Sequence, residues 1–288
     1  MEKLENEILI AKNQISFDFD GLELEEKEES LILTENVIKP LNHDWINDEV
    51  LFVVVNSRND EVFKNLSSLN LCGKKMIDWV LLAGYGCEQF VIEDCEDILG
   101  RIKSIHTDKN FIAIFYSDTP LLDKASFYRI MDYFVAKSRN FLSLKRGFIV
   151  RTDFLKNNST FMQGNVCDIE EEALTVCDSA KVLSYVYKTL NDKILYFHIK
   201  NGVTMFGMNT IFIDADVEID GKVIIYPNNI IKGESIISSG TILESGNYID
   251  NSIISNDCNI IGSHIENSKI AKGKTIKAGS QIINEEIL

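Results

Sequence analysis

The stretch IDADVEIDGKVII, residues 213–225, places isoleucine at positions 213, 219 and 225, a spacing of six residues. The spacing continues along the chain and, after a slip of phase, resumes: Ile231, Ile237, Leu243, Ile249, then Ile254, Ile260, Ile265, Ile270, Ile276 and Ile282. A period of six fits neither the 3.6-residue helix nor the two-residue alternation of a strand. It is typical of hexapeptide-repeat parallel β-helices, in which each aliphatic side chain fills one rung of a stacked core.

The residues between these rungs fit the corners of such a coil. The residue four positions after each of the first six aliphatic residues is small, β-branched or Asn: Val217, Val223, Asn229, Ser235, Thr241 and Asn247. Gly221, Gly233, Gly240 and Gly246, with several Asn and Asp residues, supply the turns between the faces. We therefore expect residues 203–288 to form a β-helix of roughly four to five coils.

A helical pattern precedes the repeats. Apolar residues recur at helical spacing, at Ala180, Leu183, Val186, Tyr187, Leu190, Ile194 and Phe197. Asp178 is placed to cap the start of this segment, and Asn201-Gly202 to end it. Residues 179–202 are therefore predicted to form one long connecting helix.

Residues 49–178 alternate strand and helix patterns. The apolar run 51–55 predicts a strand buried on both faces, residues 76–83 a helix ended by Gly84, and residues 90–92 and 111–115 two more strands around a short helix near 97–99. This order predicts a reduced doubly wound α/β sheet, in which ligands lie at the carboxyl ends of the strands. Asp118 follows such an end, although Ser117-Asp118-Thr119-Pro120 is also ordinary turn chemistry.

The first 48 residues form an acidic lead segment. Ile15, Phe17 and Phe19 alternate with polar residues, Asp20-Gly21 follows, and the alternation resumes, which predicts a β-hairpin.

Composition narrows the classes of function. The 288 residues carry a net charge of −15, so neither nucleic acid nor an anionic membrane is expected as a partner. No signal segment or long apolar span is apparent, which leads us to expect a cytoplasmic protein. The six cysteines form no Cys-x-x-Cys pair, which favours reduced structural thiols over a zinc or redox motif.

Three stretches carry a resemblance to a known family: residues 173–183 (ALTVCDSAKVL), residues 115–122 (FYSDTPLL) and residues 72–76 (CGKKM). Together with the helix and the repeats, they resemble bacterial bifunctional N-acetylglucosamine-1-phosphate uridylyltransferase/glucosamine-1-phosphate acetyltransferases. The resemblance implies a nucleotidyltransferase domain joined by a long helix to a left-handed β-helix, which in that family usually forms a homotrimer through its flat faces.

The resemblance also implies a metal site. The positions that match the family's Mg²⁺ ligands are Asp118 and Asp178, and two carboxylates plus substrate phosphates are a normal way to hold this ion. Asp178 as a simple helix cap is the alternative. Candidate phosphate-binding residues are Arg58, Lys74 and Lys75.

Other family features are missing. The strand end that should carry a glycine-rich phosphate loop reads VNSRNDE at residues 55–61, Leu66 takes the place of the family's Lys, and the family's catalytic His and sugar-phosphate ligands match no residue of this chain. His264 lies outside the matching coil, and we interpret it as a surface histidine. The acetyltransferase activity is therefore not expected.

Three hypotheses follow. The chain is a catalytically degenerate relative that still binds a nucleotide or sugar 1-phosphate and serves in envelope-sugar metabolism. Alternatively, it is an active Mg²⁺-dependent nucleotidyltransferase with a rebuilt phosphate loop, or a trimeric β-helix scaffold whose lead segment binds another protein. We favour the first.

Overall fold

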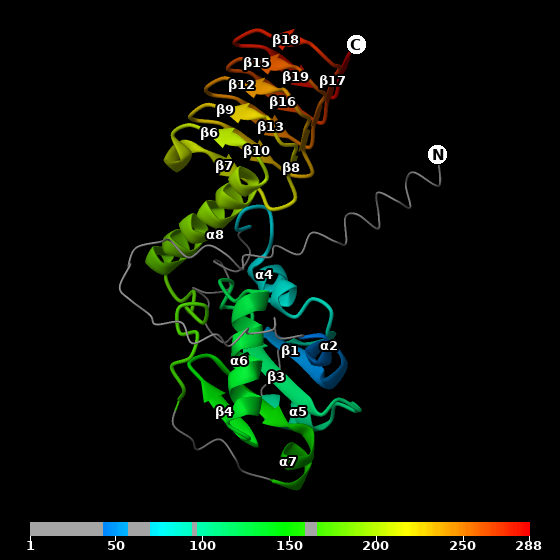
Figure 1. Cartoon of the computed structure of the whole chain (residues 1–288), viewed down its shortest axis with the longest axis vertical. Coiled ribbons are helices and arrows are strands. Elements are labelled where there is room, and N and C mark those ends of the chain that lie inside the picture. The colour runs from blue at the N-terminus through cyan, green and yellow to red at the C-terminus, as the bar shows by residue number, and fades with distance from the viewer. Residues whose placement is uncertain (1–42, 57–69, 94–96, 159–165) are drawn as a thin grey trace, which may run out of the picture. The chain divides into compact units, whose positions relative to one another are not determined.

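The computed structural model describes residues 43–56, 70–93, 97–158 and 166–288 (Figure 1). The predicted lead hairpin and Arg58 lie outside these residues. The chain divides into two compact units, an α/β unit (residues 1–65 and 76–178) and a β-helix unit (residues 66–75 and 179–288).

The α/β unit is built on one five-stranded sheet in the order β2-β1-β3-β5-β4. The strands are β1 (Val50–Asn56), β2 (Glu88–Glu93), β3 (Phe111–Tyr116), β4 (Phe141–Leu144) and β5 (Gly147–Arg151). Strands β2, β1 and β3 run parallel, whereas β5 is antiparallel to both β3 and β4. The predicted α/β sheet is therefore confirmed, with an antiparallel hairpin along one edge.

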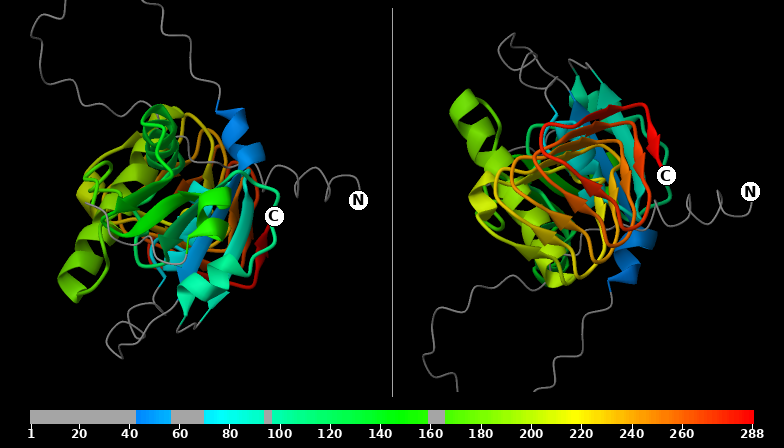
Figure 2. Two further views of the ribbon diagram at one scale, coloured as in Figure 1. Left: turned by 90° about the horizontal axis from the view of Figure 1, so that it is seen from below. Right: turned by 90° about the horizontal axis from the view of Figure 1, so that it is seen from above.

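Helices cover both faces of this sheet (Figures 1 and 2). The helices of the unit are α2 (Asp44–Glu49), α4 (Met76–Ala83), α5 (Ile98–Lys103), α6 (Lys124–Ala136) and α7 (Thr152–Asn157). Helices α4 and α6 pack with Phe52 and Phe115 on one face, and α5 and α7 pack with Val53 and Ile114 on the other. Strand β1 is buried except at its last residue because it lies between two parallel strands and two helical layers.

The β-helix unit contains three parallel five-stranded sheets, ordered β19-β16-β13-β10-β7, β20-β17-β14-β11-β8 and β18-β15-β12-β9-β6. Its strands are β6 (Thr204–Met205), β7 (Phe212–Ile213), β8 (Glu218–Ile219), β9 (Ile224–Ile225), β10 (Ile230–Lys232), β11 (Ile236–Ile237), β12 (Ile242–Leu243), β13 (Tyr248–Asp250), β14 (Ile253–Ile254), β15 (Asn259–Ile260), β16 (His264–Glu266), β17 (Lys269–Ile270), β18 (Thr275–Ile276), β19 (Gln281–Ile283) and β20 (Glu286–Ile287). A short 3₁₀ turn, Met208–Thr210, lies between β6 and β7. Viewed along the axis, successive coils superimpose (Figure 2).

Every aliphatic residue of the six-residue repeat is buried and lies in a strand. The rungs stack as predicted, with Ile231 beside both Ile213 and Ile249. The parallel β-helix expected from the periodicity is confirmed, while its left-handed sense rests on the resemblance.

The slip of phase has a local cause. Asn251, Asn267 and Asn284 each adopt the left-handed backbone conformation, with φ of 45°, 46° and 57°, directly after a three-residue strand. Asn tolerates this conformation better than most residues. These corners are one residue shorter than the others, which explains spacings of five such as that from Ile249 to Ile254. At the first glycine corner it is Lys222 (φ 68°), rather than Gly221, that is left-handed.

Buried polar side chains stack along the corners. Asn247 Nδ2 donates to Asn229 Oδ1 at 2.9 Å, and the Ser263 amide donates to Asn247 Oδ1 at 2.9 Å. A second column joins the Ser252 amide to Ser235 Oγ and the Ser268 amide to Ser252 Oγ. These ladders satisfy the backbone groups that a tight corner leaves unpaired.

Helix α8 (Ala180–Lys200) belongs to the β-helix unit. Its N-cap is Ser179, whose hydroxyl accepts from the Val182 amide, so the prediction that Asp178 caps the helix is wrong. The side chain of Asn191 reaches the first coil: Nδ2 donates to the Ile211 carbonyl at 2.9 Å, and Oδ1 accepts from the Ile213 amide at 3.2 Å. Because β7 is an edge strand, Asn191 takes the place of the strand that would otherwise lie beside it.

Candidate functional site

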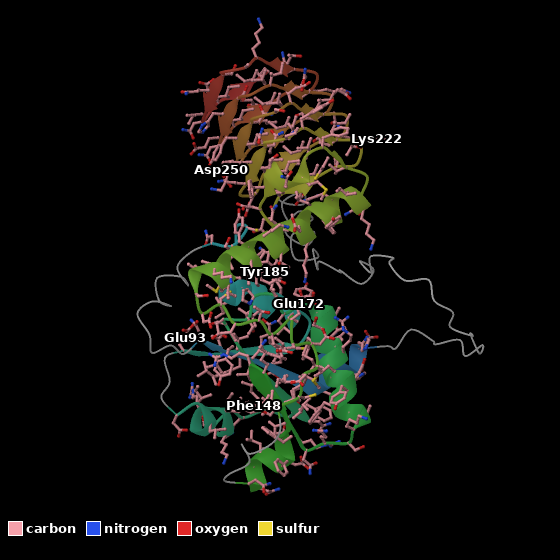
Figure 3. All side chains as sticks on the ribbon, turned by 90° about the vertical axis from the view of Figure 1, so that its left-hand side faces the viewer. Glu93, Phe148, Glu172, Tyr185, Lys222 and Asp250 are labelled. Carbon is pink, nitrogen blue, oxygen red and sulfur yellow. The ribbon has the colours of Figure 1, made fainter. Side chains whose placement is uncertain are left out.

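The candidate site lies at the carboxyl ends of the parallel strands of the α/β unit. Asp118 follows β3, and the strand ends beside it are joined by a polar chain. Ser117 Oγ donates to Asn56 Oδ1 at 2.8 Å, and Asn56 Nδ2 donates to Glu93 Oε2 at 2.8 Å. Figure 3 labels Glu93, at the end of β2. The side chains of this edge are therefore held in place by one another.

Asp118 forms a two-point ion pair with Arg146. Arg146 Nε donates to Oδ1 at 3.1 Å, and a terminal guanidinium nitrogen donates to Oδ2 at 2.6 Å. The Asp118 side chain is only 9% exposed, whereas that of Arg146 is 36% exposed. Two-point guanidinium–carboxylate pairs combine charge with fixed geometry, so both oxygens of Asp118 are oriented by this contact.

The β4–β5 hairpin places Arg146 at this position. Lys145 and Arg146 form its two-residue turn between the paired residues Leu144 and Gly147. Because β5 runs antiparallel to β3, the turn lies beside the carboxyl end of β3. Gly147 has φ of 122°, and a Cβ there would lie 2.3 Å from the Ile114 carbonyl oxygen. The hairpin therefore needs glycine to approach β3 closely enough for the ion pair.

The guanidinium also stacks on an aromatic ring. Arg146 Cζ lies 4.0 Å from the centre of the Tyr116 ring. Burial raises the pKa of the Tyr116 hydroxyl above its usual value, an effect that Arg146 opposes and Asp118 adds to. The phenol therefore remains neutral at physiological pH and supplies an uncharged platform for the cation.

The second predicted metal ligand comes from a neighbouring segment. The Cys177 amide donates to the Asp118 carbonyl oxygen at 2.8 Å, which brings the chain just before Asp178 against the end of β3. Asp178 itself is exposed. The structure thus brings together the two stretches that the sequence singled out, across about sixty residues of chain.

The other cations near this segment are also paired with acids. Arg129 on α6 binds Glu170 through Nε at 2.7 Å, and Lys145 binds Glu171 at 2.9 Å. The charges of Arg129 and Lys145 are therefore offset locally, unlike the excess positive charge that a pocket for a triphosphate requires.

The donor set does not fit Mg²⁺ in this arrangement. A divalent ion needs free carboxylate oxygens, and both oxygens of Asp118 accept from Arg146. Among the residues that the structure describes, no three His, Cys, Asp or Glu side chains are grouped so as to hold a metal ion. The assignment of Asp118 and Asp178 as metal ligands stays a prediction.

Two of the three predicted phosphate-binding residues lie in the part of the chain that the structure describes. Lys74 and Lys75 belong to the β-helix unit. Lys74 Nζ pairs with Asp216 Oδ1 at 2.5 Å, and the neighbouring Cys72 carbonyl accepts from the Ala215 amide at 2.9 Å. This short segment is therefore anchored to the first coil, which gives Lys74 a structural contact that the sequence did not indicate.

His264, His198 and Cys72 each lie among residues of the β-helix unit. His264 is half-buried, pairs with Glu266 at 3.3 Å and lies against the Tyr248 ring. Burial lowers the pKa of His198 to about 4 and raises that of the Cys72 thiol to about 12, so the first is neutral and the second protonated. The cysteines that the structure describes are free thiols, in line with the expected reduced state.

Arg146 is the site residue that the sequence reasoning missed. The signal is the turn Lys145-Arg146-Gly147 between two apolar runs, a pattern typical of a tight hairpin. That pattern predicts the turn but gives no indication that its Arg binds Asp118.

Part of this chain is similar in sequence to known proteins. No family model matches the chain. It is 37% identical over 106 residues to the bifunctional protein GlmU of Clostridium botulinum, a match covering 37% of this chain and 23% of that protein. Matches to proteins of the same name cover 113 residues in Clostridium beijerinckii (34% identical; 39% of this chain, 25% of that protein) and 106 in Streptococcus agalactiae (36% identical; 37% and 23%).

The chain thus spans about a quarter of the length of the curated relatives it matches. Among the helices that the structure describes, none is long and apolar enough to cross a membrane. The resemblance drawn from the sequence is confirmed: over a little more than a third of its length, this chain is similar in sequence to the bifunctional GlmU proteins.

Proposed function

We propose that this chain is a relative of N-acetylglucosamine-1-phosphate uridylyltransferases that no longer transfers nucleotides and instead binds a nucleotide or sugar 1-phosphate with its α/β unit. The observation that carries the proposal is the two-point ion pair between Arg146 and Asp118 at the carboxyl end of β3. This ion pair occupies Asp118, the carboxylate that would have to bind Mg²⁺ if the chain used the family's reaction.

The loss of transfer follows from charge and orientation. Nucleotidyl transfer builds negative charge on phosphate oxygens, which a metal ion and a backbone phosphate loop would stabilise. In this proposal a guanidinium binds the acid that the resemblance gives as a metal ligand, and residues 55–61 carry no glycine. Orientation and charge neutralisation each contribute several kcal/mol to such reactions, so a site that lacks both is expected to be inactive.

Binding is supported by the unused part of the same guanidinium. Arginine has five N–H donors, and two of them bind Asp118, which leaves three. The side chain is about one-third exposed and is held on Tyr116. A fixed, partly exposed guanidinium suits a phosphate group because its planar fork matches two phosphate oxygens.

The β-helix is proposed to make the protein a homotrimer. Phe212 and Ile230, neighbours on adjacent strands of one sheet, are each 37% exposed, and Ile253 on another sheet is 40% exposed. Such aliphatic and aromatic side chains on flat faces favour association between copies. The same proposal includes a cytoplasmic location and a role in the metabolism of envelope sugars.

The test combines a reaction assay with a binding assay. Pyrophosphate release is measured with UTP, N-acetylglucosamine 1-phosphate and Mg²⁺, and none is expected. Unfolding is then followed with the same ligands by the fluorescence of Trp45 and Trp79, both in the α/β unit. A ligand present at one hundred times its Kd stabilises the folded state by about 2.7 kcal/mol.

Each alternative gives a different result. Turnover with pyrophosphate release would establish an active nucleotidyltransferase with a rebuilt loop. Absence of both turnover and stabilisation, across the four common nucleoside triphosphates and several sugar 1-phosphates, would refute the proposal in favour of a β-helix scaffold.

A further inference from the structure

The carboxylate of Asp118 already has a cation. Its side chain is 9% exposed, and both of its oxygens accept hydrogen bonds from one guanidinium. It follows β3, at the position where the resemblance to the family predicts a metal ligand. A carboxylate this buried requires a compensating positive charge. In this chain the charge comes from the β4–β5 hairpin.

We propose that Arg146 is a built-in cation that occupies the metal position at Asp118, so that this site takes up no divalent ion and recognises phosphate without one. The first half concerns only Arg146 and Asp118. The second half rests on the proposed function, and it is tested separately below.

The guanidinium is well placed to exclude a metal ion. Mg²⁺ loses its hydration water reluctantly and demands strict octahedral geometry, whereas Arg146 is tethered to the protein by a short turn. Its flat face lies on Tyr116 at 4.0 Å, and the close approach of Gly147 to Ile114 fixes the hairpin against β3. A metal ion would have to displace a cation that is held on several sides.

The arrangement also explains why the nearby acids do not act as further ligands. Glu170 and Glu171 each bind a basic side chain, Arg129 and Lys145 respectively. Asp178 follows Cys177, whose amide contacts the Asp118 backbone, so its carboxylate is the nearest candidate second ligand along that segment. Removal of the guanidinium would therefore leave the Asp118 carboxylate without its cation, with Asp178 on the segment that contacts the Asp118 backbone.

The experiment uses Mn²⁺ alone as the probe, measured by electron paramagnetic resonance on the full chain. The wild-type protein is expected to bind none at this site at Mn²⁺ concentrations up to about 1 mM, which is about the Kd of the weakest Ca²⁺ sites in proteins. Arg146→Met, which keeps an unbranched apolar stem but removes the guanidinium, is expected to bind one Mn²⁺. The double variant Arg146→Met/Asp118→Asn is expected to lose it.

Two further variants keep the result decisive. Arg146→Lys retains a positive charge and is expected to bind no Mn²⁺. If Arg146→Met folds poorly because Asp118 is left without a partner, Mn²⁺ is expected to raise the unfolding temperature seen by tryptophan fluorescence. Wild-type binding of Mn²⁺ that Asp118→Asn abolishes would overturn the proposal, as would failure of Mn²⁺ either to bind or to rescue Arg146→Met.

Phosphate recognition is tested with UTP in EDTA and in Mg²⁺. The Kd is expected to agree within about twofold between the two conditions and to rise at least tenfold in Arg146→Met/Asp118→Asn, a neutral pair of similar size. UTP binding that depends on Mg²⁺ would refute the proposal that the site recognises phosphate without a metal ion. No UTP binding under either condition would refute recognition of phosphate, while the Mn²⁺ result would still decide the role of Arg146.

Discussion

Asn191 offers the sharpest test of how the β-helix begins. The side chain of Asn191 forms hydrogen bonds with the Ile211 carbonyl, just before the edge strand β7, and with the Ile213 amide within it. Asn191 is only 5% exposed. Ile211 and Ile213 are buried as well. In Asn191→Leu the side chain keeps a similar volume but can neither donate nor accept.

The expected cost follows from the two backbone groups left unpaired. A buried donor or acceptor without a partner costs about 1–3 kcal/mol, so two of them cost about 2–6 kcal/mol. The added apolar surface of leucine returns about 1–2 kcal/mol. We expect Asn191→Leu to lose about 3 kcal/mol and to lower the unfolding midpoint of the β-helix unit by about 12 °C.

The two units can be followed separately. Both tryptophans lie in the α/β unit, so their fluorescence reports that unit, whereas far-UV circular dichroism reports both. Asn191→Leu should therefore lower the unfolding midpoint of the β-helix unit, seen by circular dichroism, and leave the fluorescence midpoint of the α/β unit unchanged. Ser184→Leu, an apolar substitution at an exposed position of the same helix, is the matched control.

Asn191→Asp distinguishes the hydrogen bonds from packing. At neutral pH the carboxylate accepts from Ile213 but faces the Ile211 carbonyl, which raises its folded-state pKa. The native state then binds the extra proton, so the loss relative to wild type should shrink as pH falls through that pKa. Equal midpoints for Asn191→Leu and Ser184→Leu would refute the role given to Asn191.

Three further outcomes are expected. Gly147→Ala should destabilise the α/β unit by about 2 kcal/mol or more because of its positive φ and the contact with the Ile114 carbonyl, and the fluorescence midpoint checks this. Ile237→Ala should cost about 2–5 kcal/mol, whereas Ile236→Ala, its outward-facing neighbour, should cost much less in the same urea titration. Burial holds the pKa of His198 at about 4, below 6.5, so stability present above pH 6.5 should fall by about 3 kcal/mol down to pH 4, and His198→Gln should flatten that slope. A variant as pH-dependent as wild type would contradict this.

The β-helix could be predicted almost rung by rung. Each face of such a coil buries one aliphatic side chain. The buried positions are therefore visible in the sequence as aliphatic residues at a regular spacing, as with Ile231 and Ile249. Strands β1, β2 and β3 of the α/β unit were also predicted, β1 and β3 as continuous apolar runs, whereas β4, β5 and helices α2, α6 and α7 were not.

The sequence alone determined the repeat, strands β1 to β3 with helices α4, α5 and α8, and the acid at the end of β3, because each depends on local composition and periodicity. Only the tertiary structure decided what those groups touch. Asp118 meets Arg146, Lys74 meets Asp216 and Asn191 meets β7, across separations of 28, 142 and about twenty residues. A charged or amide side chain has the same local pattern whether water or a distant residue satisfies it, so its partner is set by which segments the folded chain brings together.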